Sequence, residues 1–384
     1  MKLEWRLKQL LEQYNLYQYG VETQIARECG LHRHTIGKFL RNQMQSPKLE
    51  VLEKICGCLI EKGVPADILP GVLFGIKPSG LWQAIGQSKE ILICLGEYHL
   101  KGKMITTPQI SPSISRHDSV VSSKIIHYLS SEAELRDARP SVKMVYVPFS
   151  FTPEVVRNSG DGFEQDSERA RRIFNDIRTN RRNNCSVIMI GSQRVNYLVE
   201  YMVADLFHCK PFVPANEDPK VPVYLCYRNF DHLVPSCFGG QENPLYPSKE
   251  IRHGTYYVDE NFEWQSFEWQ EGKDDSGVVI IIREADNVEL AVFGFSGRAT
   301  SAIGTALLQK SEQFWPDPDG GRNQTVISGG KEIGIYLCRV KISKNAGKRN
   351  DRVCETFEND SVEIIPLHHT VLEKFLAKGK DREK

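Results

Sequence analysis

The chain has 384 residues, of which 40% are hydrophobic and 26% charged, a composition typical of globular proteins. Its 49 basic and 49 acidic side chains give a formal net charge of +0, which excludes a uniformly basic nucleic-acid binder; any such contact must come from a local patch. No stretch of about 18 apolar residues occurs, so no membrane span is expected.

Residues 1–70 are expected to be all helical, and the length of the chain favours two or three domains. The first segment, MKLEWRLKQLLEQY, carries a helical stripe of leucines and lacks the apolar core of a signal peptide. The ten cysteines form no CxxC pair, which favours reduced and buried thiols. We therefore expect a cytoplasmic protein without a metal site or a cofactor motif.

The segment ETQIARECGLHRHTIGKFLRN, residues 22–42, predicts two short helices joined by a tight turn. Gly30 stands at the turn, where a positive φ is needed, and the small Ala26 permits the two helices to approach closely. Ile36 and Phe39 form an apolar stripe on the second helix that faces back toward the first. The polar residues left on the free face, which a DNA major groove would meet, are Arg33, His34, Thr35, Lys38 and Arg41.

Residues 1–63, including the later helix PKLEVLEKICGCLI, resemble the Cro/lambda-repressor class of helix-turn-helix DNA-binding domains. The resemblance implies a compact bundle of four or five helices that binds double-stranded DNA, usually as a homodimer. Gly37 departs from the pattern, because it shortens the reading face and weakens the helix by roughly 1 kcal/mol relative to Ala. The alternative is a helical hairpin that contacts another protein. The base-facing positions that the resemblance implies are Arg33, His34, Gly37 and Lys38.

Residues 71–88 are rich in Pro and Gly and are expected to form a connector. From residue 89 to 370, short β-rich runs alternate with helical stretches, which predicts a large Rossmann-like α/β domain with a mostly parallel sheet. A break near 215–275 would divide it into two subdomains, and residues 371–384 are expected to be a charged tail. Residues 277–295 predict an antiparallel hairpin within this sheet.

Ligands of open α/β sheets bind beyond the carboxyl ends of the strands, so the turns that follow the predicted strands are candidate binding sites. Backbone amides there, together with helix N-termini, would favour an anion. The same glycines and capping residues also occur in ordinary tight turns, and no Walker or GxGxxG pattern is present. The candidate ligand-binding residues are Gly96, Asp118, Gly191, Ser192, Arg194, Ser296, Gly297 and Arg298.

Three functional hypotheses follow. The first is a DNA-binding transcriptional regulator whose α/β domain senses a small anionic ligand or mediates assembly. The second is a DNA-associated enzyme acting on a nucleotide or nucleic acid, and the third is a DNA-binding module on an inert oligomerisation scaffold. Loss of turnover on mutation of Asp118 would favour the enzyme, and DNA binding that no small molecule alters would favour the scaffold. The candidate catalytic residues of the enzyme are Glu97, Asp118, Ser296 and Arg298.

Overall fold

The computed structural model of the chain divides into two compact units, residues Met1–Gly80 with Ile327–Lys331, and Leu81–Val326 with Glu332–Lys384. The structure describes residues 2–64, 74–77, 80–99, 112–131, 140–149, 160–180, 184–213, 220–227, 234–240, 253–284, 287–314, 325–342 and 361–380, apart from 6, 15, 42, 45, 46 and 329.

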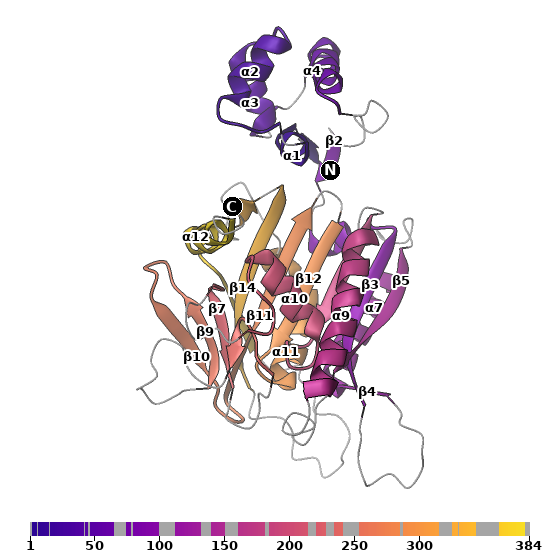
Figure 1. The fold of residues 1–384 in the computed structure, drawn as a ribbon, viewed down its shortest axis with the longest axis vertical. Helices are drawn as coiled ribbons and strands as arrows, with labels where there is room; N and C mark the ends of the chain where they lie inside the picture. Colours follow the sequence, from indigo (N-terminus) through magenta and orange to yellow (C-terminus); the bar gives the residue numbers. More distant parts are fainter. Residues whose placement is uncertain are drawn as a thin grey trace. The chain divides into compact units, whose positions relative to one another are not determined.

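The first unit is a small helical cluster with a two-stranded sheet (Figure 1). Its helices share one core, in which the Trp5 and Phe39 rings meet edge to face with centroids 4.9 Å apart. The prediction of an all-helical unit is wrong at its first residues, because Lys2–Trp5 (β1) pairs antiparallel with Phe74–Lys77 (β2). The helices are α1 (Leu7–Gln13), α2 (Val21–Glu28), α3 (Arg33–Leu40) and α4 (Leu49–Glu61).

The second unit is built on a nine-stranded mixed sheet. The strands follow the order β13-β14-β11-β12-β6-β3-β4, with β15 beside β14 and β5 beside β3. Three neighbouring pairs are parallel, β5 with β3, β3 with β6 and β6 with β12. The strands are β3 (Glu90–His99), β4 (Pro112–Ile114), β5 (Ser141–Phe149), β6 (Cys185–Ile190), β11 (Asp274–Glu284), β12 (Asn287–Gly294), β13 (Val326–Ser328), β14 (Lys331–Lys341) and β15 (Ser361–Pro366).

The mixed α/β character is confirmed, but the sheet is mixed, so the prediction of a mostly parallel, Rossmann-like sheet is not confirmed. The predicted hairpin is present, since β11 pairs antiparallel with β12 from Gly277↔Gly294 to Glu284↔Asn287. β4 and β15 are also antiparallel to their neighbours. Apolar runs show that strands are buried on both faces, but they do not encode the direction of each strand.

Helices cover both faces of this sheet (Figure 1). Alternate residues of β6 separate the two cores: Val187 and Met189 pack with α9 and α10, whereas Ile188 and Ile190 pack with α7 and α11. Every residue of β6 is buried, as expected for a central strand. The helices are α6 (Leu81–Gly86), α7 (Arg116–Ser131) and α11 (Gly297–Gln309) on one face, and α9 (Gly160–Asn180) and α10 (Tyr197–Leu206) on the other.

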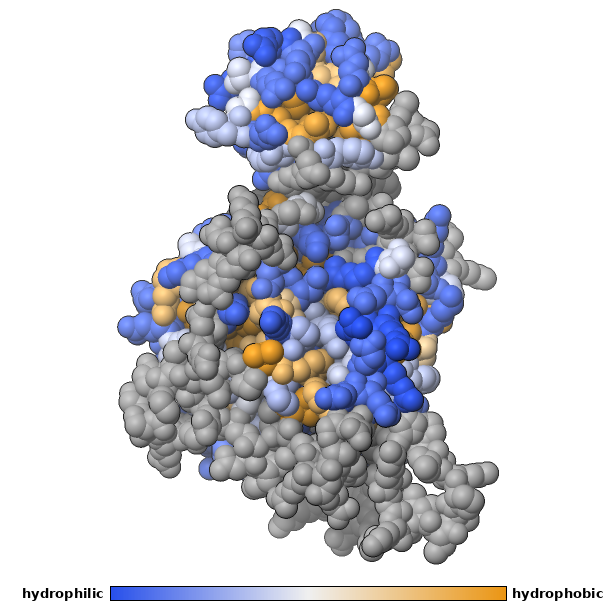
Figure 2. Space-filling view, viewed as in Figure 1, coloured by the Kyte–Doolittle hydropathy of each residue, from blue (hydrophilic) through white to orange (hydrophobic). Residues whose placement is uncertain are grey.

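The surface of α9 is strongly hydrophilic (Figure 2). Its exposed arginines are largely paired within the helix, since Arg171 and Arg172 both contact the carboxylate of Glu168. Arg178 pairs instead with Asp205 at the end of α10. The helix thus carries an internally compensated, solvated face.

Two further elements differ from expectation. The segment predicted as a charged tail continues as helix α12 (His369–Lys380), whose Val371 and Leu372 are fully buried. The predicted connector, residues 71–88, is not uniform, because β2 pairs in the first unit and α6 contributes the buried Leu81 and Trp82 to the second; residues 71–73, 78 and 79 lie outside the described part. A four-stranded sheet, in the order β10-β9-β7-β8, completes the second unit with β7 (Val223–Cys226), β8 (Gly239–Gly240), β9 (Gly254–Val258) and β10 (Trp264–Glu268).

Candidate functional site

Helices α2 and α3 are joined by a short turn and pack in one core. Gly30 lies at the turn with φ +62°, in the left-handed region that glycine adopts without strain. His32 caps α3, its ring nitrogen accepting a hydrogen bond from the His34 backbone N–H at 3.2 Å. The faces that meet are buried, and Ile25 and Ile36 are almost completely excluded from solvent. On the opposite side, Arg33, His34 and Arg41 are exposed, and Thr35 and Lys38 are half-buried.

This outer face also holds an acidic side chain that the sequence did not place there. The carboxylate of Glu22 lies 3.8 Å from both Arg33 and Arg41. Gly37, an implied base-facing residue, is buried, and a Cβ on it would collide with the Glu22 carboxylate. The missing side chain of Gly37 therefore leaves room for Glu22 between Arg33 and Arg41.

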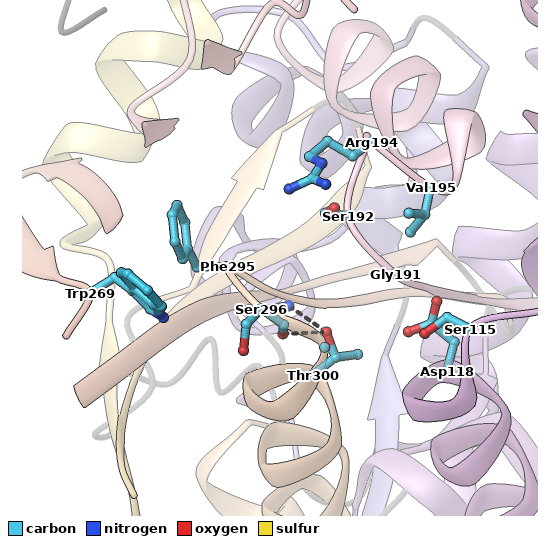
Figure 3. A pocket seen from close by; sticks show the side chains of 12 residues that line it. Ser115, Asp118, Gly191, Ser192, Arg194, Val195, Trp269, Phe295, Ser296 and Thr300 are labelled. Atoms are coloured by element: carbon cyan, nitrogen blue, oxygen red, sulfur yellow. Dashed lines mark hydrogen bonds between the residues drawn. The ribbon is translucent and has the colours of Figure 1, made fainter. Parts of the chain in front are cut away.

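The second unit contains a pocket of about 300 Å³ at the carboxyl ends of β6 and β12 (Figure 3). These strands are adjacent and parallel, but β6 leads into α10 on one face of the sheet and β12 into α11 on the other. A crevice opens where neighbouring connections diverge in this way. The lining residues are Ser115, Asp118, Gly191, Ser192, Arg194, Val195, Trp269, Gly294, Phe295, Ser296, Gly297 and Thr300.

Six of the eight predicted ligand-binding residues line this pocket: Asp118, Gly191, Ser192, Arg194, Ser296 and Gly297. Gly96 does not, because its Cα packs directly against the backbone carbonyl of Val195, behind the turn. Arg298 is not a lining residue either; its charge acts on Asp275. Ser115 was missed although it begins a Ser-x-x-Asp capping pattern, whereas no local pattern could have indicated Trp269, which follows β10.

Asp118 is the most unusual group in the pocket. Its side chain is only 2% exposed, and its Oδ2 has no hydrogen-bond partner in the described part of the chain. Burial raises the pKa of Asp118 to about 7, and a hydrogen bond from Ser115 offsets part of that rise. Gly191 leaves room for this carboxyl, since a Cβ there would lie 2.9 Å from Oδ2, and its φ of +99° suits only glycine.

The turn between β12 and α11 is held rigidly. The Ser296 hydroxyl donates to the carboxylate of Asp275 and accepts from the Ala299 N–H at 3.3 Å, which caps α11. The Thr300 hydroxyl accepts from the Gly294 N–H at 2.9 Å and donates to the Ser296 carbonyl. Burial raises the pKa of Asp275 to about 6, against the opposing effect of the Ser296 hydrogen bond.

Aromatic rings form one wall of the pocket. The Phe295 ring stacks on Tyr227 at 5.0 Å with an interplanar angle of 14°, and the Trp269 ring lies 6.1 Å from Phe295. The guanidinium of Arg194 lies over the Tyr227 ring, 5.0 Å from its centroid. This stacking fixes a cation and a flat apolar surface beside the ends of the strands.

The pocket can thus offer an apolar wall, a cation, helix N-termini and a buried carboxyl.

In the described ranges, no three His, Cys, Asp or Glu side chains gather in a way that could hold a metal ion. None of the helices that the structure describes is long and apolar enough to cross a membrane. No protein-family model matches the chain, and no curated protein or solved structure is significantly similar to it.

Proposed function

We propose that this protein is a sequence-specific DNA-binding transcriptional regulator that senses a small, anionic ligand in the pocket of its α/β unit. The observation that carries the proposal is the packing of α3 across α2. The buried Ile25 and Ile36 join the two helices, and Gly30 makes the turn between them. This packing leaves the polar face of α3 exposed, as a reading helix requires.

The exposed residues of α3 have the chemistry of base and phosphate contacts. Arg33 lies at the first position of the helix, where it can donate two hydrogen bonds to guanine O6 and N7. Lys38 and Arg41 lie further along and suit the phosphate backbone, while His34 and Thr35 suit either. A local patch of this kind is sufficient although the whole chain has no net charge.

A dimeric assembly would pair two such helices on two half-sites. On α4, Leu49 is 71% exposed and Ile60 is 45% exposed. Eleven residues correspond to about three helical turns, so both side chains lie on the same side of the helix. This apolar surface supports a contact with a second copy in a homodimer. A ligand that prefers one arrangement of the assembled units would shift the population toward it and so alter DNA affinity.

The test is a selection from random double-stranded DNA with the purified full chain and with Arg33→Ala/Lys38→Ala. We expect an enriched palindromic motif that the variant loses. The matched control, Arg27→Ala/Lys48→Ala, removes two exposed positive charges from other parts of the same unit and should retain the motif. Equal and weak binding by all three proteins, without enrichment, would exclude a sequence reader.

A second candidate function is an enzyme that acts on a nucleotide, as the sequence also suggested. The specific observation in its favour is the carboxyl of Asp118, since a pKa near 7 suits a general acid or base at neutral pH. Of the other candidate catalytic residues, Ser296 lines the pocket, whereas Glu97 and Arg298 do not. Chromatography of nucleotides incubated with the protein and with Asp118→Asn distinguishes the functions: a ligand recovered unchanged favours the sensor.

A further inference from the structure

We infer that the pocket binds a nucleoside monophosphate, with its base against Trp269, its phosphate at the N-terminus of α11 and a ribose hydroxyl on Asp118. The inference deepens the proposed sensor function and rests on it, in that the pocket must have a ligand. Three sides of the pocket differ in chemistry, and together they indicate the chemical class of the ligand.

Figure 3 shows these three sides around one central space. Trp269 and Phe295 lie together at one end, and Asp118 with Ser115 lies at the other. Polar groups from the turn after β6 and from the start of α11 lie between them. A nucleotide has matching geometry, because its ribose carries a planar base, a phosphate and a pair of hydroxyls that point in three directions.

Asp118 specifies a hydrogen-bonding group on the ligand. A buried polar atom without a partner is costly and rare in proteins, so Oδ2 points to a ligand group, such as a hydroxyl, that can hydrogen-bond with it. Gly191, which lines the same pocket, has no Cβ to occupy the space beside Oδ2. Inorganic phosphate as a dianion carries a single O–H, whereas a nucleotide can place a ribose hydroxyl at this carboxyl while its phosphate lies at the helix start.

The phosphate side is formed by two helix starts. The first-turn amides of a helix have no intrahelical partner and carry a partial positive charge. His117, in the first turn of α7, touches Gly297 at the start of α11, where a Cβ would lie 2.5 Å from the imidazole Cδ2. The His117 ring also bonds Ser301 at 3.1 Å. The two N-termini are therefore fixed side by side, with Arg194 among the other lining residues.

The aromatic wall and the volume of the pocket further restrict the class of ligand. A base can stack on the exposed part of an aromatic wall with little dependence on its identity. The volume of about 300 Å³ lies at the lower end of the range of about 300–1,000 Å³ for small-molecule sites. One nucleotide fits this size better than a dinucleotide does.

The test is calorimetric titration of the full chain with AMP, GMP, CMP and UMP, and with adenosine, ribose 5-phosphate and inorganic phosphate. We expect at least one of the four nucleotides to bind tenfold or more tightly than ribose 5-phosphate or inorganic phosphate. Asp118→Asn should weaken that nucleotide at least tenfold, and Trp269→Leu should weaken it without affecting ribose 5-phosphate. Asp176→Asn, an exposed carboxylate on α9, is the matched control and should bind as the wild type does.

A change in the ligand gives a test that does not depend on the folding of a variant. The 2′,3′-dideoxy form of the bound nucleotide should bind the wild-type protein at least tenfold more weakly, because it lacks the donors for Asp118. The same deletion should have little further effect in Asp118→Asn, since both changes remove one interaction. Equal binding of the ribo and dideoxy forms, or of inorganic phosphate and the nucleotide, would overturn the inference.

The DNA selection separates the two proposals. A protein that enriches a DNA motif but binds none of the four nucleotides overturns this inference and leaves the regulator. A protein that binds a nucleotide through Asp118 but enriches no DNA sequence overturns the regulator and leaves the inference.

Discussion

Two carboxylates, one in each unit, have opposite environments. Glu22, on α2, lies at the surface of the first unit, with its side chain 23% exposed and with Arg33 and Arg41 both 3.8 Å away. Asp118 is buried at the start of α7, and its Oδ2 has no partner among the described residues. Water and two cations stabilise the first charge, whereas burial makes the second costly.

Of the two, only the exposed carboxylate can be explained by the fold alone. The ion pair between Arg283 and Glu332, both only 3% exposed and 3.1 Å apart, is an example of a buried carboxylate that this fold compensates with a cation. Asp118 is not compensated in this way. A polar group that weakens the fold and lines a pocket therefore points to a ligand.

The largest effect is expected from breaking the compensated buried pair. Arg283→Met leaves Glu332 buried without its cation and should lower the free energy of unfolding by about 3–5 kcal/mol. Chemical denaturation measures this loss, and Arg283→Met/Glu332→Leu should recover most of it. A loss below about 1 kcal/mol in the single variant would show that burial alone does not make a charge costly in this fold. The buried Asp118 would then not differ in this respect from the exposed Glu22.

A smaller effect is expected from Asp118→Asn, and it depends on pH. The folded pKa of Asp118, about 7, lies above its ordinary value of 3.8, so the folded state holds a proton that the unfolded state releases. The wild type should therefore lose stability as pH rises from 5 to 7, by roughly 2–3 kcal/mol from this group. Asp118→Asn cannot ionise and should lack this loss.

Denaturation of both proteins at pH 5, 6, 7 and 8 gives the difference between them. Asp275, which burial also shifts upward, is present in both proteins, as are Arg194, His117 and Arg298 around the pocket, so their effects largely cancel. Asp176→Asn, on the exposed face of α9, controls for the loss of a negative charge. Parallel pH profiles for wild type and Asp118→Asn would show that Asp118 is ionised at low pH in the fold.

The elements of the fold were predictable where the signal is local. Apolar runs located β3, β6, β11, β12 and β14, and the hairpin of β11 with β12 was predicted and is present. The pairing of β1 with β2 joins segments far apart in sequence, and no periodicity reveals such a partner. Helix α12 was missed although Val371, Leu372, Phe375 and Leu376 have helical spacing, because the lysines that follow dominate the composition.

The pocket was predictable in part for the same reason. Turns at the ends of strands can be located from the strands, so Gly191, Ser192 and Ser296 were found. The burial of Asp118 and the approach of Trp269 depend on how distant segments pack, which spacing does not encode. The position of Glu22 between two arginines depends on the crossing of two helices and on the missing side chain of Gly37.

The smallest effect is expected from Glu22→Gln. Removing this charge frees Arg33 for a base and Arg41 for a phosphate and removes a repulsion, so DNA affinity should rise severalfold, with a steeper dependence on salt. Stability should change by less than about 1 kcal/mol, because exposed ion pairs contribute little. Fluorescence anisotropy with a selected DNA site measures the affinity, and Glu50→Gln, on α4, is the matched control. A weaker complex would mean that Glu22 orients the two arginines for reading DNA, and the surface carboxylate would then be as functional as the buried one.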